Sequence, residues 1–260
     1  MYDGKHYSLI AQAKAVMTNP QEMNSKEAEI MEKVLSCRDY KKRFTNWCQY
    51  TPAYPKPSFE HLASALIMYY TSFDQAVAPF DQMMNQQRTT DTLVEKGFNL
   101  FMGKAQCGTC HFVPLFNGVK PPYTGSEFEV LGVPADTSYE KGDTDLGRSL
   151  VFDAPEMRYA FRTGTVRNAA VTSPYMHNGV FTTLDQVVEF YNQGGGAGKG
   201  LNYPHQTLSA EKLNLNALEK QQLIVFIRSL TENLRDSTAI KTLPTSKRKL
   251  LTSRTVNGSY

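Results

Sequence analysis

GFNLFMGKAQCGTCH, residues 97–111, is the stretch of this 260-residue chain that decides its fold. It ends in Cys107, Cys110 and His111, two cysteines three positions apart with a histidine directly after the second. Residues at helical spacing lead into this triplet, and they are Leu93, Gly97, Leu100 and Phe101. The spacing predicts an amphipathic helix from about Thr90, which packs one face on a core and delivers the cysteines at its end.

A C-x-x-C-H sequence is the attachment pattern of c-type haem, and chemistry explains the spacing. Two thiols three positions apart reach the two vinyl groups on one side of a porphyrin, and the next histidine is carried beneath the iron as its proximal ligand. A redox-active thiol pair would follow a strand in a βαβ unit, whereas a helical pattern precedes this one. A zinc site would need a second ligand pair, yet Cys37 and Cys48 are distant and wrongly spaced. The motif therefore predicts one covalently bound haem c.

The opposite face of the iron needs a second ligand, and the residues alone leave its identity open. The downstream candidates are Met176, His177, Tyr191 and His205. Met176 is attractive, because a thioether opposite histidine gives an electron-transfer haem of raised potential. Tyr191 is less distinctive, because an aromatic residue on an amphipathic helix usually belongs to the core.

Composition narrows the class of protein. The 28 basic and 25 acidic residues give a net charge of +3, which is too small to indicate nucleic-acid binding. Residues 236–260 carry much of the basic excess and are expected to form a solvated polar tail. The chain has no run of 18 apolar residues to span a membrane, and its opening residues lack the apolar region of a signal peptide. A disulfide between Cys37 and Cys48 stays open, because the sequence does not give the distance between their Cα atoms.

Helical periodicity dominates outside one long irregular segment. Helices are expected to begin near Asn24, Ser58, Thr90, Thr183 and Asn216. Gly194–Gly196 should stop the helix that Thr183 caps. Residues 112–165 hold many Gly, Pro, Asp and Thr without clear periodicity, so loops are expected there. Because strand signals are scarce, the predicted fold class is mainly α with long loops.

Further stretches resemble a known family. They are Tyr2–Lys5, Asn19–Met23, Gly97–Phe101, Phe161–Asn168, Thr172–Gly179, Thr183–Leu184 and Phe190–Tyr191. On these residues and the haem motif, the chain resembles the bacterial di-haem cytochrome c peroxidase family, which includes the tyrosine-ligated enzyme of methylamine utilisation. The resemblance implies a cytochrome c-like haem domain over residues 86–235, preceded by the remainder of an N-terminal peroxidatic lobe over residues 1–85.

Members of that family carry two haem lobes, in which the N-terminal haem reacts with peroxide and the C-terminal haem relays electrons. The resemblance makes His111 the proximal ligand of the relay haem. The family's sixth ligand lies 14 residues beyond the histidine of its Pro-Tyr-x-His motif, here His177, which points to Tyr191 and leaves Met176 as the alternative. Tyrosinate ligation would stabilise ferric iron and lower the potential relative to methionine.

The resemblance also assigns roles outside the motif. Glu22 matches the family's acid–base glutamate, which takes a proton from bound peroxide and returns it to the leaving oxygen. On the residues alone, Glu22 is a dipole partner of the helix expected at Asn24. Thr172 and Pro174 match residues whose backbone carbonyls bind a calcium between the lobes. Arg167 is expected to reach a haem propionate or otherwise to pair with an acid.

Departures from the family pattern limit these implications. No second C-x-x-C-H occurs, so a second haem is expected only in a longer parent, of which this chain would be the C-terminal portion. Tyr2 stands where the family often has tryptophan, and Ala105 occupies the position of the methylamine enzyme's inter-haem tryptophan. That enzyme's modification of a partner protein is therefore not carried over.

The resulting hypothesis is a haem c electron-transfer domain of a cytochrome c peroxidase, which reduces hydrogen peroxide to water with electrons from a small donor protein such as a cytochrome c. The chain alone is expected to be a poor peroxidase. Two alternatives stay open: a single-haem electron carrier, and another oxidase of the superfamily that acts on an organic substrate. Because haem c is attached outside the cytoplasm, a periplasmic or exported location is expected. A homodimer also stays open.

Overall fold

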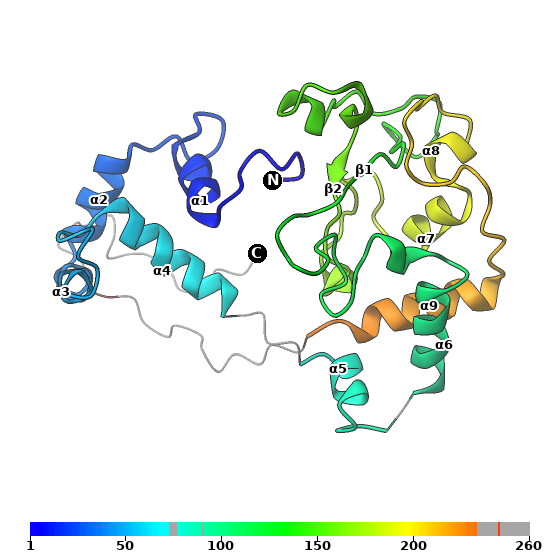
Figure 1. Cartoon of the computed structure of the whole chain (residues 1–260), viewed down its shortest axis with the longest axis horizontal. Coiled ribbons are helices and arrows are strands. Elements are labelled where there is room, and N and C mark those ends of the chain that lie inside the picture. The colour runs from blue at the N-terminus through cyan, green and yellow to red at the C-terminus, as the bar shows by residue number, and fades with distance from the viewer. Residues whose placement is uncertain (73–76, 90, 233–243, 245–260) are drawn as a thin grey trace. The chain divides into compact units, whose positions relative to one another are not determined.

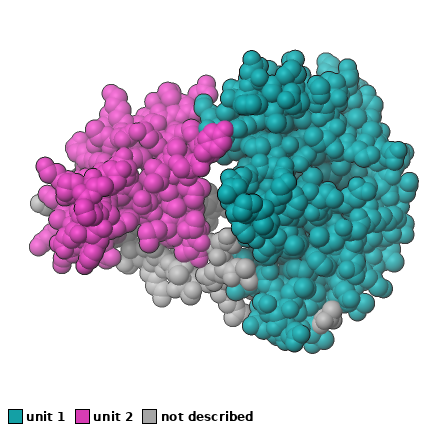
Figure 2. Space-filling model, viewed as in Figure 1, with its two compact units in different colours: residues 1–5, 76–233 teal, residues 6–75, 234–260 magenta. Residues whose placement is uncertain are grey.

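The chain divides into two compact units, coloured separately in Figure 2. The computed structural model describes residues 1–72, 77–89, 91–232 and 244. The motif unit comprises Met1–Lys5 and Ala76–Asn233, and the helical unit comprises His6–Gln75 and Leu234–Tyr260. The basic tail expected at residues 236–260 lies outside the described residues, apart from position 244. The domain boundary expected after residue 85 stays a prediction.

The helical unit contains α1 (Leu9–Thr18), α2 (Glu27–Leu35), α3 (Arg38–Cys48) and α4 (Phe59–Thr71). Its small core joins α1 to α4 through Ala13, Met17, Phe59 and Ala63. Ser58 caps α4 in a capping box with His61, so the helix start predicted there is confirmed. The box satisfies backbone N–H groups that the first helical turn leaves without partners.

One expectation for the helical unit differs from the structure, and the open question of a disulfide is answered. Asn24 has a φ of 43° and lies before α2, whose N-cap is Lys26, so the predicted cap is wrong although the helix forms. Cys37 and Cys48 stand at opposite ends of α3. At 1.5 Å per residue they lie about 16 Å apart along the helix, well beyond the reach of a disulfide. Both cysteines are buried, and neither is part of a disulfide.

The motif unit contains α5 (Pro79–Met84), α6 (Thr92–Met102), α7 (Leu184–Asn192), α8 (Gly195–Gly198) and α9 (Ala217–Ser229), as Figure 1 shows. Asp91 caps α6, next to the predicted start, and Thr183 and Asn216 cap α7 and α9 as predicted. α7 ends at Asn192, just before the triple glycine, but Gly195 and Gly196 enter the short α8, which the sequence did not predict.

α6 and α9 pack closely where they meet at Gly97. A Cβ atom built at Gly97 would lie 2.1 Å from the carbonyl oxygen of Gln222 and 2.7 Å from Cβ of Phe226. Only glycine permits this approach without moving a helix. α6, which leads into the haem motif, is therefore held directly against α9.

An aromatic cluster fills the space around this helix pair. Its members lie with ring centroids 5.2 to 5.8 Å apart, mostly edge to face, and they are Phe80, Phe98, Phe101, Phe116 and Phe226. Such pairs add about 0.5–1.5 kcal/mol beyond the burial of their surface. Phe116 belongs to the loop after the motif, so the cluster fixes that loop against α6 and α9.

Residues 112–165 are largely irregular, as predicted. Short elements around and within this segment are η1 (Cys107–Thr109), β1 (Phe128–Glu129), η2 (Arg148–Leu150), η3 (Pro155–Met157), β2 (Phe161–Arg162) and η4 (Ala169–Val171). β1 and β2 pair antiparallel, with Glu129 opposite Phe161. The predicted mainly α, cytochrome c-like fold with long loops is confirmed.

The N-terminal five residues pack on this irregular segment. Arg162 N donates to the carbonyl oxygen of Tyr2 at 2.7 Å. Arg148 Nη1 donates to the carbonyl oxygen of Gly4 at 2.7 Å. These contacts explain why Met1–Lys5 belong to the motif unit. Among the described residues, no helix is both long and apolar enough to cross a membrane.

Candidate haem site

The turn after α6 places the attachment cysteines. α6 ends at Met102 with Gly103 as its C-cap, and Gln106 adopts a left-handed φ of 56° immediately before η1 begins at Cys107. His111 N then donates to the carbonyl oxygen of Cys107 at 2.9 Å. This single turn keeps Cys107, Cys110 and His111 together, as attachment to one porphyrin edge requires. Cys107 also packs against the core of the motif unit.

His111 is oriented by two backbone carbonyls. Its Nδ1 lies 3.0 Å from the carbonyl oxygen of Gly164 and 3.3 Å from that of Phe116. Carbonyl oxygens only accept, so Nδ1 carries the proton and Nε2 keeps its lone pair. Burial lowers the pKa of His111, which favours this neutral form despite the two hydrogen bonds. A neutral imidazole that donates through its second nitrogen is the form in which proteins present histidine to a metal.

The two cysteines are protonated thiols in their present surroundings. Burial raises the pKa of Cys107 to about 12. Burial, followed by the neighbouring Glu129 carboxylate, raises the pKa of Cys110 to about 11. Redox-active cysteines have lowered pKa values instead, so this environment argues against a thiol–disulfide centre. In the part of the chain that the structure describes, no group of three or more His, Cys, Asp or Glu side chains is placed to hold a metal ion.

Tyr191 on α7 interacts electrostatically with both thiols. Burial is the main cause that raises the pKa of the Tyr191 hydroxyl, and its interactions with Cys107, Cys110 and Glu129 raise it further. The hydroxyl therefore lies within electrostatic range of both attachment sulfurs. The donor set is thus two thiols, a neutral imidazole with a free Nε2 and a phenol oxygen, which fits a covalently attached haem with two axial ligands.

The other sixth-ligand candidates have different surroundings. His177 is stacked on Phe161, with ring centroids 3.5 Å apart, and its Nε2 lies 3.3 Å from Asp143 Oδ2. This Nε2 has no hydrogen bond of good geometry and is buried. Burial lowers the pKa of His177 although Asp143 opposes the shift. His205 is exposed in a loop, and Met176 is half-buried with a φ of 68°. Met176 therefore stays the alternative to Tyr191.

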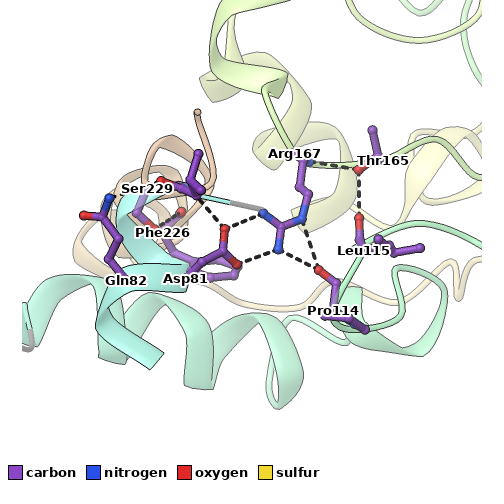
Figure 3. Close-up of polar contacts among 10 residues, drawn as sticks. Asp81, Gln82, Pro114, Leu115, Thr165, Arg167, Phe226 and Ser229 are labelled. Atoms are coloured by element: carbon purple, nitrogen blue, oxygen red, sulfur yellow. Dashed lines mark hydrogen bonds and ion pairs between the residues drawn. The ribbon is translucent and has the colours of Figure 1, made fainter. Parts of the chain in front are cut away.

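Arg167 joins the segment after the motif to α5, as Figure 3 shows. Its guanidinium forms a bidentate ion pair with Asp81 at 2.7 and 2.8 Å, and both side chains are nearly buried. Arg167 also donates from Nε and Nη2 to the carbonyl oxygen of Pro114. Of the two partners expected from the sequence, a haem propionate or an acid, the structure shows the acid.

Comparison with known proteins shows which family the chain resembles. The model of the di-haem cytochrome c peroxidase family matches residues 1–89. Cytochrome-c peroxidase IdrP1 of Pseudomonas sp. strain SCT is 36% identical over 177 residues, which are 61% of this chain and 45% of that protein. Methylamine utilization protein MauG of Methylorubrum extorquens is 29% identical over 247 residues, which are 94% of this chain and 62% of that protein. The chain is similar to members of the di-haem cytochrome c peroxidase family.

The solved structures agree on the fold. A MauG-like protein associated with microbial copper homeostasis superposes with a TM-score of 0.68 at 21% identity, over 87% of this chain and 69% of that one. The chain spans about half the length of the first cytochrome-c peroxidases that it matches, between 44% and 46%. The resemblance to a family of di-haem proteins is in line with the donor set of this chain.

The family resemblance also singled out three residues in exposed loops. Glu22 belongs to the helical unit, in the exposed loop after α1, where its Oε1 accepts from Asn19 Nδ2 at 3.1 Å. Thr172 and Pro174 lie in an exposed loop after η4, and Thr172 Oγ1 donates to the carbonyl oxygen of Asn168. The acid–base role of Glu22 and the calcium at Thr172 and Pro174 stay predictions.

Sequence reasoning missed two features of the candidate haem site. Glu129 enters the pocket from β1 and accepts a hydrogen bond from Cys110 Sγ at 3.5 Å. The Gly164 carbonyl that orients His111 is a backbone group in a loop. Neither has a local sequence signature, because one is an isolated acid in an irregular segment and the other depends on how two distant loops meet.

Proposed function

We propose that this chain binds one haem c through Cys107 and Cys110, with His111 and Tyr191 as the axial ligands. The observation that carries the proposal is the tautomer of His111, since two carbonyls hold its Nδ1 proton and leave Nε2 for iron. Tyr191 is supported by its hydroxyl lying within electrostatic range of both thiols. When bound, the haem supplies reversible one-electron transfer.

The proposed role is electron relay in the reduction of hydrogen peroxide. The net reaction takes one peroxide, two electrons and two protons to two waters, and the electrons come from a small donor protein such as a cytochrome c. This chain's part is to hold the relay group rigidly, because reorganisation slows electron transfer. The aromatic cluster, the crossing at Gly97 and the Arg167–Asp81 pair provide that rigidity.

Glu22 is proposed as the acid–base group of the peroxidatic lobe. Its carboxylate would accept a proton from peroxide and return it to the leaving oxygen. The proposal is supported by the family model, whose match over residues 1–89 includes Glu22. The second haem needed for that step would be bound by a further part of the protein. Because haem c is attached outside the cytoplasm, the proposed location is the periplasm or the cell exterior.

One observation favours a second candidate function, a single-haem electron carrier. The 260 residues contain a single C-x-x-C-H, so the chain by itself offers one attachment site. Such a carrier would exchange electrons with a donor and an acceptor but would not turn over peroxide. The same axial ligands and the same pocket would serve it.

Haem counting and peroxide turnover test both functions. The full chain, expressed with the haem c maturation apparatus, should gain the mass of one haem, and the pyridine haemochrome should give one haem per chain. Steady-state peroxide reduction with a reduced donor should be slow for this chain and fast for a longer protein with a second haem. A chain that matures without added haem would refute the proposal. A second-haem protein that reduces no peroxide would favour the carrier.

A further inference from the structure

The carboxylate of Glu129 faces the attachment site from a loop strand. Glu129 is the second residue of β1 and pairs with Phe161 of β2, which fixes its backbone. Cys110 Sγ donates to Glu129 Oε1 at 3.5 Å. The carboxylate is also near enough to Tyr191 to contribute to the raised pKa of that hydroxyl, after burial and the two cysteines. One side chain therefore contacts an attachment sulfur and lies within electrostatic range of the proposed sixth ligand.

The charge of Glu129 is not neutralised by an ion pair within the described part of the chain. Its neighbour Glu127 pairs with Lys120 at 2.5 Å, and the ion pairs found elsewhere in that part of the chain join other acids. Glu129 is half-buried, so water screens its charge less than that of an exposed acid. Its field therefore acts on whatever group is bound at Cys110.

We propose that Glu129 is a positioning residue whose carboxylate lowers the reduction potential of the haem bound at Cys107 and Cys110. The inference rests on the proposed function, since it requires haem at those cysteines. Ferric haem carries one more positive charge than ferrous haem, so a nearby anion stabilises the ferric state. Glu129 and a tyrosinate at Tyr191 act in the same direction and would together set a low-potential relay.

The test is the midpoint potential of the haem-loaded full chain, measured by spectroelectrochemical titration. Glu129→Gln keeps the shape and removes the charge, so the equilibrium constant for reduction should rise at least about tenfold, an upward shift of about 59 mV for one electron. Glu129→Asp keeps the charge and should shift the potential much less. Glu140→Gln removes an equal charge from an exposed loop and controls for net charge.

The outcomes separate this inference from the proposed function. If Glu129→Gln binds haem with the wild-type ferric spectrum but shows the potential of Glu140→Gln, the inference is overturned and the haem assignment stands. If the wild-type chain binds no haem, the proposed function fails and this inference fails with it. If Glu129→Gln does not mature, the midpoint potential of Glu129→Ser should rise by the same amount instead. Equal potentials for Glu129→Ser and Glu129→Asp would overturn the inference.

Discussion

His111 Nδ1 and the carbonyl oxygen of Gly164 lie 3.0 Å apart, although 53 residues separate them in the chain. This contact connects the haem motif to the loop that follows β2. It fixes both the tautomer and the ring orientation of His111, which are the two properties an axial ligand needs. A bond between distant loops thus prepares a site whose covalent part is a short local motif.

Replacing His111 tests whether this prepared nitrogen binds iron. His111→Ala should still attach haem, because both thiols remain, but the ferric spectrum should become that of a haem without its proximal ligand. Added imidazole should restore a wild-type-like spectrum by filling the site. His205→Ala, in an exposed loop, serves as control and should keep the wild-type spectrum. An unchanged spectrum in His111→Ala would refute the assignment.

Tyr191 and Met176 make opposite predictions in the near-infrared. With Tyr191 as ligand, ferric protein lacks the near-infrared band of methionine ligation, and Tyr191→Phe opens the iron to added ligands such as cyanide or azide. Met176→Leu should then leave the ferric spectrum almost unchanged. A methionine-type band that disappears in Met176→Leu, with no change in Tyr191→Phe, would transfer the assignment to Met176.

The parts of this fold that the sequence predicted depend on local chemistry. Ser58, Thr183 and Asn216 cap their helices because a side-chain acceptor needs only the next turn of backbone. α3 was not predicted from the sequence, because RDYKKRFTNWC buries only Phe44 and Cys48 and shows a weak apolar pattern. Such a segment becomes helical through its helix propensity and its packing against neighbouring helices. Neither produces a clear repeat of apolar residues in the sequence.

The candidate site likewise contains residues that the sequence predicts and residues that it does not. The spacing of Cys107, Cys110 and His111 indicates haem by itself, because one turn of chain suffices to align them. Glu129 could not be predicted, since its approach to Cys110 depends on the pairing of β1 with β2. The choice of Tyr191 over Met176 required the family resemblance, and the electrostatic interaction of Tyr191 with both thiols depends on the tertiary fold.

Gly97 is expected to be essential for the packing of α6 on α9. Gly97→Ala would push a methyl group against Gln222 O and Phe226 Cβ, so the unfolding free energy should fall by about 1–3 kcal/mol or more. The matched control is Gly125→Ala, where a Cβ would meet nothing within 4 Å. Denaturant titration monitored by the haem absorption measures both. Equal stability of the two variants would contradict the close packing.

Asp143 should contribute to acid sensitivity. Burial acts to raise its pKa, but hydrogen bonds from Asp145 N at 2.8 Å and Asn178 Nδ2 at 2.6 Å, together with nearby His177, hold the pKa below its usual 3.8. Because the folded pKa lies below the unfolded one, this stabilisation is present above about pH 4 and is lost as pH falls through the folded pKa. In Asp143→Asn the unfolding free energy should change less with pH in that acidic window, and Asn178→Ala should have the same effect to a smaller degree. An unchanged acid profile in Asp143→Asn would contradict this role.

Breaking the Arg167–Asp81 pair should lower the unfolding free energy strongly, whereas replacing both residues should lower it much less. Their side chains are 8% and 14% exposed, so Arg167→Met leaves a nearly buried carboxylate without its cation and should cost about 3–5 kcal/mol of unfolding free energy. The double variant Arg167→Met/Asp81→Leu removes both charges and should cost much less than the two single variants added together. Arg43→Met breaks the exposed pair with Asp39, which is worth at most about 0.5 kcal/mol. Additive single and double variants, measured by denaturant titration, would show that Arg167 and Asp81 do not act as a pair.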